Sequence, residues 1–279
     1  MSQDLAILPE CLFKYRHFPD DDDGLAWLKS LITKGVLYHA EPRLLNDPFE
    51  CNPCWVTNAT QQQLQMLWSS KASGEALGQP KKRRGRLRKR FAARCGRADF
   101  WAEKWGGVAA NFGVFSVAQR ADSVLMWAHY TDQFRGVCVE LALKQHFENS
   151  WDVEARDRDK RLRPVRVDYG QVRPKLETSG LAAAMLGDTS ALQQLARVFE
   201  VKADDWSYEQ EWRLIRSFTR EKVRAIECGG NIVRTVLLGP RIRPEYAKLV
   251  RSWVSSDAPH IQVRQARLSL EDFKVVLDP

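Results

Sequence analysis

The sequence lacks the features that mark membrane, secreted and disulfide-rich proteins. None of its 279 residues falls in a run of roughly 18 consecutive apolar residues, the length that a membrane-spanning helix needs. The first residues, Met1 to Asp4, carry an acid where a secretory signal would carry Lys or Arg. Six scattered cysteines are too few for a disulfide scaffold in a chain of this length. We therefore expect a soluble, cytoplasmic protein with reduced thiols and no membrane partner.

Several catalytic motifs are absent as well. There is no Gly-rich phosphate loop of the Walker or dinucleotide type, so P-loop hydrolysis and hydride transfer have no support. No Gly-x-Ser-x-Gly elbow occurs, and no cysteine stands in a nucleophile context. Only the Cys51-Asn52-Pro53-Cys54 stretch has the spacing of zinc ligands, and the sequence offers no evident second pair. We expect structural cysteines and no resident metal.

The pattern of apolar residues predicts an α+β protein. Strands are dispersed among helices, which favours a single domain over residues 1–279 with a mixed or antiparallel sheet flanked by helices. A basic helical insertion is expected at about 60–109. Prolines in the stretch 41–50 exclude regular helix and require an ordered turn or loop. The other expected helices are 25–32, ended by Gly35, 123–130, 181–202 and 245–254; the expected strands are 12–16, 36–39, 114–117, 136–141, 165–169, 212–217, 232–238, 261–267 and 273–277.

Positive charge is concentrated in one segment. The chain carries 43 Lys and Arg against 35 Asp and Glu, a net charge of +8. Residues 81–90 hold eight basic residues and no acid, so the rest of the chain is electrically balanced. Such a run tends to stay extended and solvated or to begin a helix, and it can bind phosphates with steep salt dependence. The candidate nucleic-acid contacts are Lys81, Lys82, Arg83, Arg84, Arg86, Arg88, Lys89 and Arg90.

Two glutamates precede a predicted strand. In an extended chain Glu209, Glu211 and Arg213 share one face, and Tyr208 and Trp212 point to the other. Paired carboxylates near a cation can divide the work of stabilising positive charge and removing a proton. An ion-paired surface strand explains the same pattern.

Two further segments carry polar groups next to aromatic ones. In Met126-Trp127-Ala128-His129-Tyr130, the His and Tyr can bind a planar ligand, or the segment is a buried helix. In Asn46-Asp47-Pro48-Phe49-Glu50, the acids can bind a metal ion, or Asn and Asp before Pro build a turn through their own backbone.

These stretches together resemble the bacterial DUF2971 family, whose members are uncharacterised. The similar pieces are Phe13-Lys14-Tyr15-Arg16, Leu45 to Glu50, Val114-Phe115-Ser116, Leu125 to Tyr130, Gly136-Val137-Cys138, Val167-Asp168-Tyr169 and Trp206 to Arg213. They occur in order along nearly the whole chain. The resemblance alone implies no activity.

A second resemblance is to ADP-ribosyltransferases of the Arg-Ser-Glu class. Arg16 (or Lys14), Ser116 and Glu209-x-Glu211 occur in the order of that class, although Ser116 lacks a Ser-x-Ser pattern. The resemblance implies a split sheet that binds NAD as substrate. It implies that Arg16 holds the NAD, Ser116 organises the pocket, Glu211 stabilises an oxocarbenium-like transition state and Glu209 activates the acceptor. The remaining candidate substrate-binding residues are Lys14, Tyr15, Asn46, Asp47, Trp127, His129, Tyr130, Trp206 and Arg213.

Three functional hypotheses follow from these motifs. The first is an NAD-cleaving ADP-ribosyltransferase of the toxin or phage-defence type, with a nucleic-acid or protein acceptor and a regulatory partner protein. The second is a metal-dependent nuclease that uses acids or histidine from the set Asp47, Glu50, His129, Glu209 and Glu211. The third is a non-enzymatic module that binds DNA, RNA or another polyanion through residues 81–90.

Overall fold

The computed structural model describes residues 8–75, 80–147, 163–218 and 223–277. The chain divides into two compact units, which we describe separately: unit 1 comprises residues 1–40, 112–167 and 205–279, and unit 2 comprises residues 41–111 and 168–204. The helical insertion expected at 60–109 lies within unit 2. Residues 1–4, from which we inferred that a signal is absent, lie outside the described part of the chain.

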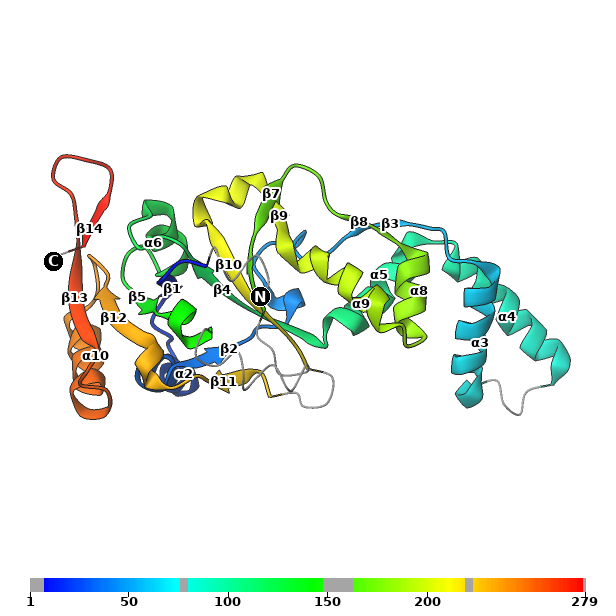
Figure 1. The fold of residues 1–279 in the computed structure, drawn as a ribbon, viewed down its shortest axis with the longest axis horizontal. Helices are drawn as coiled ribbons and strands as arrows, with labels where there is room; N and C mark the ends of the chain where they lie inside the picture. Colours follow the sequence, from blue (N-terminus) through cyan, green and yellow to red (C-terminus); the bar gives the residue numbers. More distant parts are fainter. Residues whose placement is uncertain (1–7, 76–79, 148–162, 219–222, 278–279) are drawn as a thin grey trace. The chain divides into compact units, whose positions relative to one another are not determined.

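Unit 1 is built on a mixed sheet, in agreement with the predicted α+β class. Eight of its described strands form one sheet in the order β14-β13-β12-β5-β1-β4-β10-β6 (Figure 1). Only β12 and β13 are parallel neighbours; the other neighbours in this sheet are antiparallel. The strands are β1 (Leu12–Arg16), β4 (Phe112–Ala118), β5 (Val137–Leu141), β6 (Arg163–Arg166), β10 (Glu211–Ser217), β12 (Val233–Leu238), β13 (Gln262–Leu268) and β14 (Val275–Leu277). A separate pair joins β2 (Val36–Tyr38) to β11 (Ala225–Glu227).

The helices of unit 1 begin and end where the sequence indicates. Asp21 caps α2 (Asp22–Lys34) by accepting a 2.7 Å hydrogen bond from the Gly24 amide. Gly35, at φ 63°, ends the helix in the left-handed conformation that glycine adopts without strain. Unit 1 also contains helices α6 (Val124–Tyr130) and α10 (Pro244–Asp257).

Each face of the sheet has its own apolar core. One face contributes Val137, Val139 and Leu141 of β5 to a cluster with residues of α2 and α10. The other face contributes Tyr15 and Cys138 to a smaller cluster that contains Trp127 of α6. The alternation of side chains along β1 and β5 assigns each residue to one of these faces.

A buried histidine in unit 1 makes the stability of the protein depend on pH. His39 is 0 % exposed, and burial lowers its pKa from 6.5 to about 4. The unfolded chain therefore binds a proton at a higher pH than the folded chain does. Stability is full above pH 6.5 and falls as the pH drops toward 4, by up to about 3 kcal/mol from this residue.

The test compares urea unfolding of the wild type and His39→Asn at pH 7.5 and pH 4.5. Asn keeps a side-chain polar group near the Leu37 carbonyl, which lies 3.1 Å from His39 Nδ1, but it does not titrate. We expect the variant to lose markedly less stability between the two pH values. Equal losses in the two proteins would contradict the assignment.

Unit 2 contains helices and two short strand pairs. Its α-helices are α3 (Gln61–Glu75), α4 (Lys81–Cys95), α5 (Ala98–Ala109), α8 (Thr178–Met185) and α9 (Thr189–Leu195). The strand pairs are β3 (Cys54–Val56) with β8 (Lys175–Glu177) and β7 (Asp168–Gly170) with β9 (Val201–Ala203). None of the helices in the described ranges has the length and apolarity that a membrane crossing requires.

Two predicted elements of this region are wrong in their extent. The helix expected over 181–202 is interrupted twice. Gly187, at φ 101°, ends the helical segment after α8, and α9 is followed by a 3-10 turn and then by strand β9. The strand expected over 165–169 is divided between β6 of the large sheet and β7 of unit 2. The Ala- and Leu-rich composition of 181–202 and the alternation of Val165, Val167 and Tyr169 continue across the two breaks and give no sign of them.

Candidate functional site

The basic run at 81–90 forms the first turns of helix α4 rather than an extended segment. Leu87, Phe91 and Cys95 are less exposed than the basic positions and recur every four residues, which places them on one side of the helix. The Phe91 ring lies 5.7 Å from Trp68 of α3 and 5.8 Å from Phe100 of α5, measured between ring centroids. This apolar stripe holds α4 against its neighbours and explains why a strongly charged segment is helical (Figure 1).

The rest of α4 presents cations to solvent. All eight basic residues in 81–90 are exposed, and none of them has an acidic partner among the described residues. Four of them occupy the first turn, where positive charge opposes the helix dipole, and Pro80 provides no side-chain cap there. The start of α4 is therefore a surface where bound anions would relieve electrostatic repulsion.

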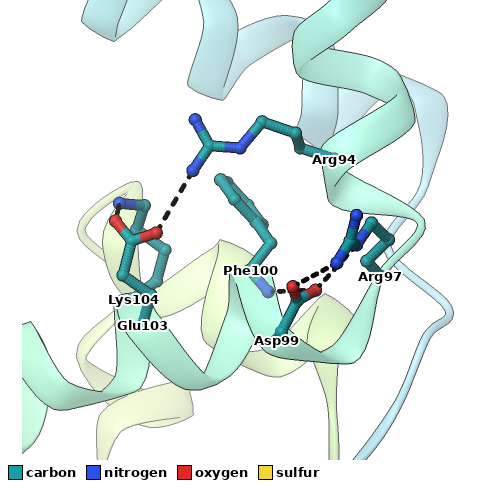
Figure 2. A network of polar contacts seen from close by, with 6 residues as sticks. All are labelled: Arg94, Arg97, Asp99, Phe100, Glu103 and Lys104. Carbon is teal, nitrogen blue, oxygen red and sulfur yellow. Dashed lines mark hydrogen bonds and ion pairs between the residues drawn. The ribbon is translucent and has the colours of Figure 1, made fainter.

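The end of α4 is different, because its cations are neutralised. Figure 2 shows Arg94 directed at Glu103 and Arg97 directed at Asp99 on either side of Phe100. The Arg94 Nη2–Glu103 Oε2 distance is 3.2 Å, and the Arg97 Nη2–Asp99 Oδ2 distance is 2.6 Å. Glu103 also contacts Lys104. On α4, the described cations without an acidic partner are thus those of residues 81–90.

In unit 1, the sheet register places Ser116, Glu211 and Arg213 on one face. Ser116 on β4 is the cross-strand partner of Arg213 on β10, and Ala118 is the partner of Glu211. Cross-strand partners share a face, as do residues two apart on one strand. The expectation that Glu211 and Arg213 project together is confirmed.

The basic residues of β1 lie on the opposite face. Phe13 pairs with Ala118, so Phe13 and Tyr15 share the face of Ser116, and the alternate residues Lys14 and Arg16 do not. Lys14 Nζ donates to the backbone carbonyl oxygen of Ser116 at 2.6 Å. The same Nζ lies 4.6 Å from the centre of the Phe115 ring, whose side chain is on the opposite face from that of Ser116. Arg16 is exposed. The convergence of Arg16 with Ser116 and Glu211 that the sequence suggested does not occur in unit 1.

Glu211 is held in a buried ion pair. Arg213 Nε lies 2.9 Å from Glu211 Oε1, and Arg213 Nη2 lies 3.0 Å from Glu211 Oε2. Glu211 is 3 % exposed and Arg213 is 0 % exposed. Both carboxylate oxygens therefore already accept charge-assisted hydrogen bonds.

Glu209 does not share the strand face of Glu211. Residues Asp204–Glu209 form a 3-10 turn (η4), and Gln210 has a left-handed φ of 45°, so β10 begins only at Glu211. The predicted alternation from Tyr208 to Arg213 is wrong for its first residues. Tyr208 packs with the smaller core cluster, whereas Trp212 is buried on the opposite face of the sheet.

Helix α6 and the η4 turn are joined by two hydrogen bonds. Tyr130 donates its hydroxyl to Glu209 Oε1, and the Tyr208 hydroxyl lies 2.9 Å from His129 Nδ1. Glu209 is buried, whereas His129 is exposed and Tyr208 is partly exposed. An imidazole bonded to a phenol can exchange a proton with it, so this junction has acid–base capacity.

The nearby aromatic residues divide between core and surface. Trp127 is 0 % exposed and donates its indole N–H to the Ala121 carbonyl oxygen at 2.7 Å. Its ring meets Tyr15 edge-on, and burial raises the pKa of Tyr15 well above its ordinary value. These two residues pack the core, while Trp206 is partly exposed beside Tyr208.

The predicted turn at 46–50 is confirmed in unit 2. Asp47 Oδ1 accepts from the Phe49 amide at 2.8 Å, and the Asp47 carbonyl oxygen accepts from the Glu50 amide at 3.1 Å. Asn46 is exposed, and Asp47 is buried. Glu50 forms a buried ion pair with Lys202, with 3.7 Å between Oε2 and Nζ. The sequence gives no sign of this pair, because 152 positions separate the two residues and they share no motif.

The described part of the chain contains no group of three or more His, Cys, Asp or Glu side chains that could hold a metal ion. The Cys51–Cys54 pair consists of one buried and one exposed thiol. The acids named for a nuclease are therefore not gathered into a cluster among the residues that the structure describes.

Comparison with known proteins gives a match to a family model over part of the chain. No curated protein and no solved structure matches the chain significantly. Residues 126–214 match the model of DUF2971, described as a protein of unknown function. The match begins within α6 and ends within β10, so it contains the α6–η4 junction and the Glu211–Arg213 pair. The match covers residues 126–214 of the 279, and over these residues the chain is similar to DUF2971.

Proposed function

We propose that the protein binds double-stranded nucleic acid through α4. The observation that carries this proposal is the set of eight exposed basic residues at 81–90, held on a packed helix without an acidic partner among the described residues. Phosphate neutralisation and counterion release supply the main affinity of such surfaces.

The side chains of α4 favour a duplex over a single strand. The basic residues of 81–90 point around the helix, and four of them, Lys82, Arg86, Lys89 and Arg90, lie on the side away from the packed stripe. Proteins that hold single strands also stack bases on aromatic side chains, and the one aromatic residue of α4, Phe91, packs against α3 and α5.

The composition of α4 favours binding without strong sequence preference. Residues 81–90 contain only Lys, Arg, Gly and Leu, so the amide side chains that read adenine are missing and direct base readout is restricted to contacts of Arg or Lys with guanine. Lys and Arg then contact phosphates wherever the duplex presents them. We expect duplexes of different sequence to bind with similar affinity.

The two enzymatic hypotheses have less support. Cleavage of NAD by an Arg-Ser-Glu site would need Arg16 beside Ser116 and a carboxylate open to substrate, and Glu211 is already engaged by Arg213. Metal-dependent cleavage would need a ligand cluster, which the described residues lack. Nicotinamide release from NAD remains the direct assay of the first hypothesis.

The proposal is tested by fluorescence anisotropy with a labelled 20-base-pair duplex and the matching single strand, as DNA and as RNA. At roughly 0.1 M salt we expect the duplexes to bind at least about tenfold more tightly than the single strands. Equal or tighter binding of the single strands would contradict the proposed duplex preference. A lack of binding to all four probes would contradict the function itself.

A further inference from the structure

Unit 2 contains a pocket of about 430 Å³ between the turn at 41–52 and helix α5. The α5 residues that line it are Ala102, Trp105, Gly106 and Ala109, which recur at the spacing of one helix face. Trp105 is fixed there because its indole N–H donates to the Cys51 carbonyl oxygen at 2.8 Å and its ring stacks on Phe199. The pocket therefore has one well-ordered helical wall.

The opposite wall contains three acids, of which two have cationic partners. Glu41 Oε2 lies 2.5 Å from Arg43 Nε, and Glu50 is paired with Lys202. Asp47 also lines the pocket and is only 6 % exposed. Within the described ranges its side chain makes one hydrogen bond, the 2.8 Å bond from the Phe49 amide to Oδ1, and no described cation pairs with it.

The turn uses one oxygen of Asp47. The second oxygen has no described hydrogen-bond partner and is not fully buried, so it is open to solvent in the pocket and a bound cation can pair with it. The surrounding walls include prolines and the Trp105 side chain, which suit the apolar body of a small molecule. Charge and wall chemistry together define a ligand with a cationic head and an apolar body.

We infer that this pocket binds a small organic cation of the amine, amidine or guanidine class, with Asp47 pairing with the cationic group. The inference is independent of nucleic-acid binding, because α4 attracts anions and none of residues 81–90 lines this pocket.

The experiment measures binding of benzamidine, agmatine and tyramine to the full chain by calorimetry and ligand-observed NMR. Benzamide, the neutral analogue of benzamidine, reports the contribution of charge. We expect at least one of the three cations to bind, with benzamide at least about tenfold weaker than benzamidine if benzamidine is the one that binds. Asp47→Asn keeps an oxygen that can accept from the Phe49 amide, and it should lower the affinity for the cation by about tenfold or more.

A second variant tests the pocket without changing its charge. A Cβ at Gly106 meets nothing within 4 Å, so Gly106→Leu can fill the cavity from α5 and should abolish binding. Gly107→Leu is the matched control, because Gly107 has equal space but does not line the pocket. Asp188→Asn is the control for Asp47→Asn, since Asp188 also caps a turn but lies at a different pocket.

Binding that is lost in Asp47→Asn and Gly106→Leu and kept in both controls supports the inference. Unchanged binding in either test variant would overturn it. Failure of the wild type to bind any of the three cations below about 10 mM would also overturn it. If Asp47→Asn does not fold, as judged by its thermal unfolding, the Gly106→Leu result decides the question alone.

Discussion

Replacing Lys82, Arg86, Lys89 and Arg90 with Gln is expected to weaken duplex binding by about 100- to 1000-fold at roughly 0.15 M salt. These four residues recur at i, i+4, i+7 and i+8, which places them on the side of α4 away from the Leu87–Phe91–Cys95 stripe. Each lost phosphate contact removes about 1 kcal/mol of counterion-release free energy at this salt concentration. Gln has a helix propensity close to that of Lys and Arg, so α4 should remain helical.

The control carries the same change of net charge at other places. Lys34, Arg234, Lys248 and Arg251 are exposed basic residues outside α4, and their replacement by Gln also lowers the net charge from +8 to +4. We expect this variant to bind within about threefold of the wild type, because long-range charge contributes little beyond a Debye length. Equal losses in the two variants would mean that net charge, and not α4, carries the affinity.

The second large effect concerns stability. Glu211→Gln should lower the free energy of unfolding by about 3–5 kcal/mol, because it leaves the buried Arg213 guanidinium without its bidentate carboxylate. Urea unfolding followed by circular dichroism measures this change.

An exposed Arg–carboxylate pair, also bidentate and also formed by residues two apart, provides the control. Arg120 and Asp122 form two hydrogen bonds of 2.8 Å each, with side chains 57 % and 38 % exposed. Asp122→Asn should change the unfolding free energy by less than about 1 kcal/mol. Similar losses of unfolding free energy for the two substitutions would show that the large effect of Glu211→Gln does not come from the burial of its ion pair. The comparison also guards the nicotinamide-release assay, because lost activity in an unstable Glu211→Gln protein would not identify a catalytic residue.

Local signals in the sequence predicted most elements of unit 1. The acid at Asp21, the apolar spacing to Ile32 and Gly35 define α2, and the alternation in 137–141 defines β5. These signals are visible because capping, helical periodicity and strand alternation act over a few residues. The interruption at Gly187 was not visible, since glycine inside an apolar pattern is compatible with either a helix or its end.

The site was harder to predict, because it depends on pairing between distant strands. Residue types and their order suggested that Arg16, Ser116 and Glu211 form one site. The face on which each side chain lies is set by register, and the pairing of Phe13 with Ala118 puts Arg16 on the other side. A shift of one residue would reverse this outcome, and nothing in a single sequence fixes it. The left-handed Gln210, which separates Glu209 from β10, also carries no local sequence signal.

The salt dependence of duplex binding tests directly whether α4 is the nucleic-acid contact. We would measure the dissociation constant of the wild type and of the Lys82, Arg86, Lys89 and Arg90 quadruple Gln variant from about 0.05 to 0.3 M salt. We expect a steep slope of log affinity against log salt for the wild type, reduced by about 3 to 4 in the variant, since each phosphate contact contributes about 0.9. An unchanged slope would contradict the assignment of α4 as the nucleic-acid contact.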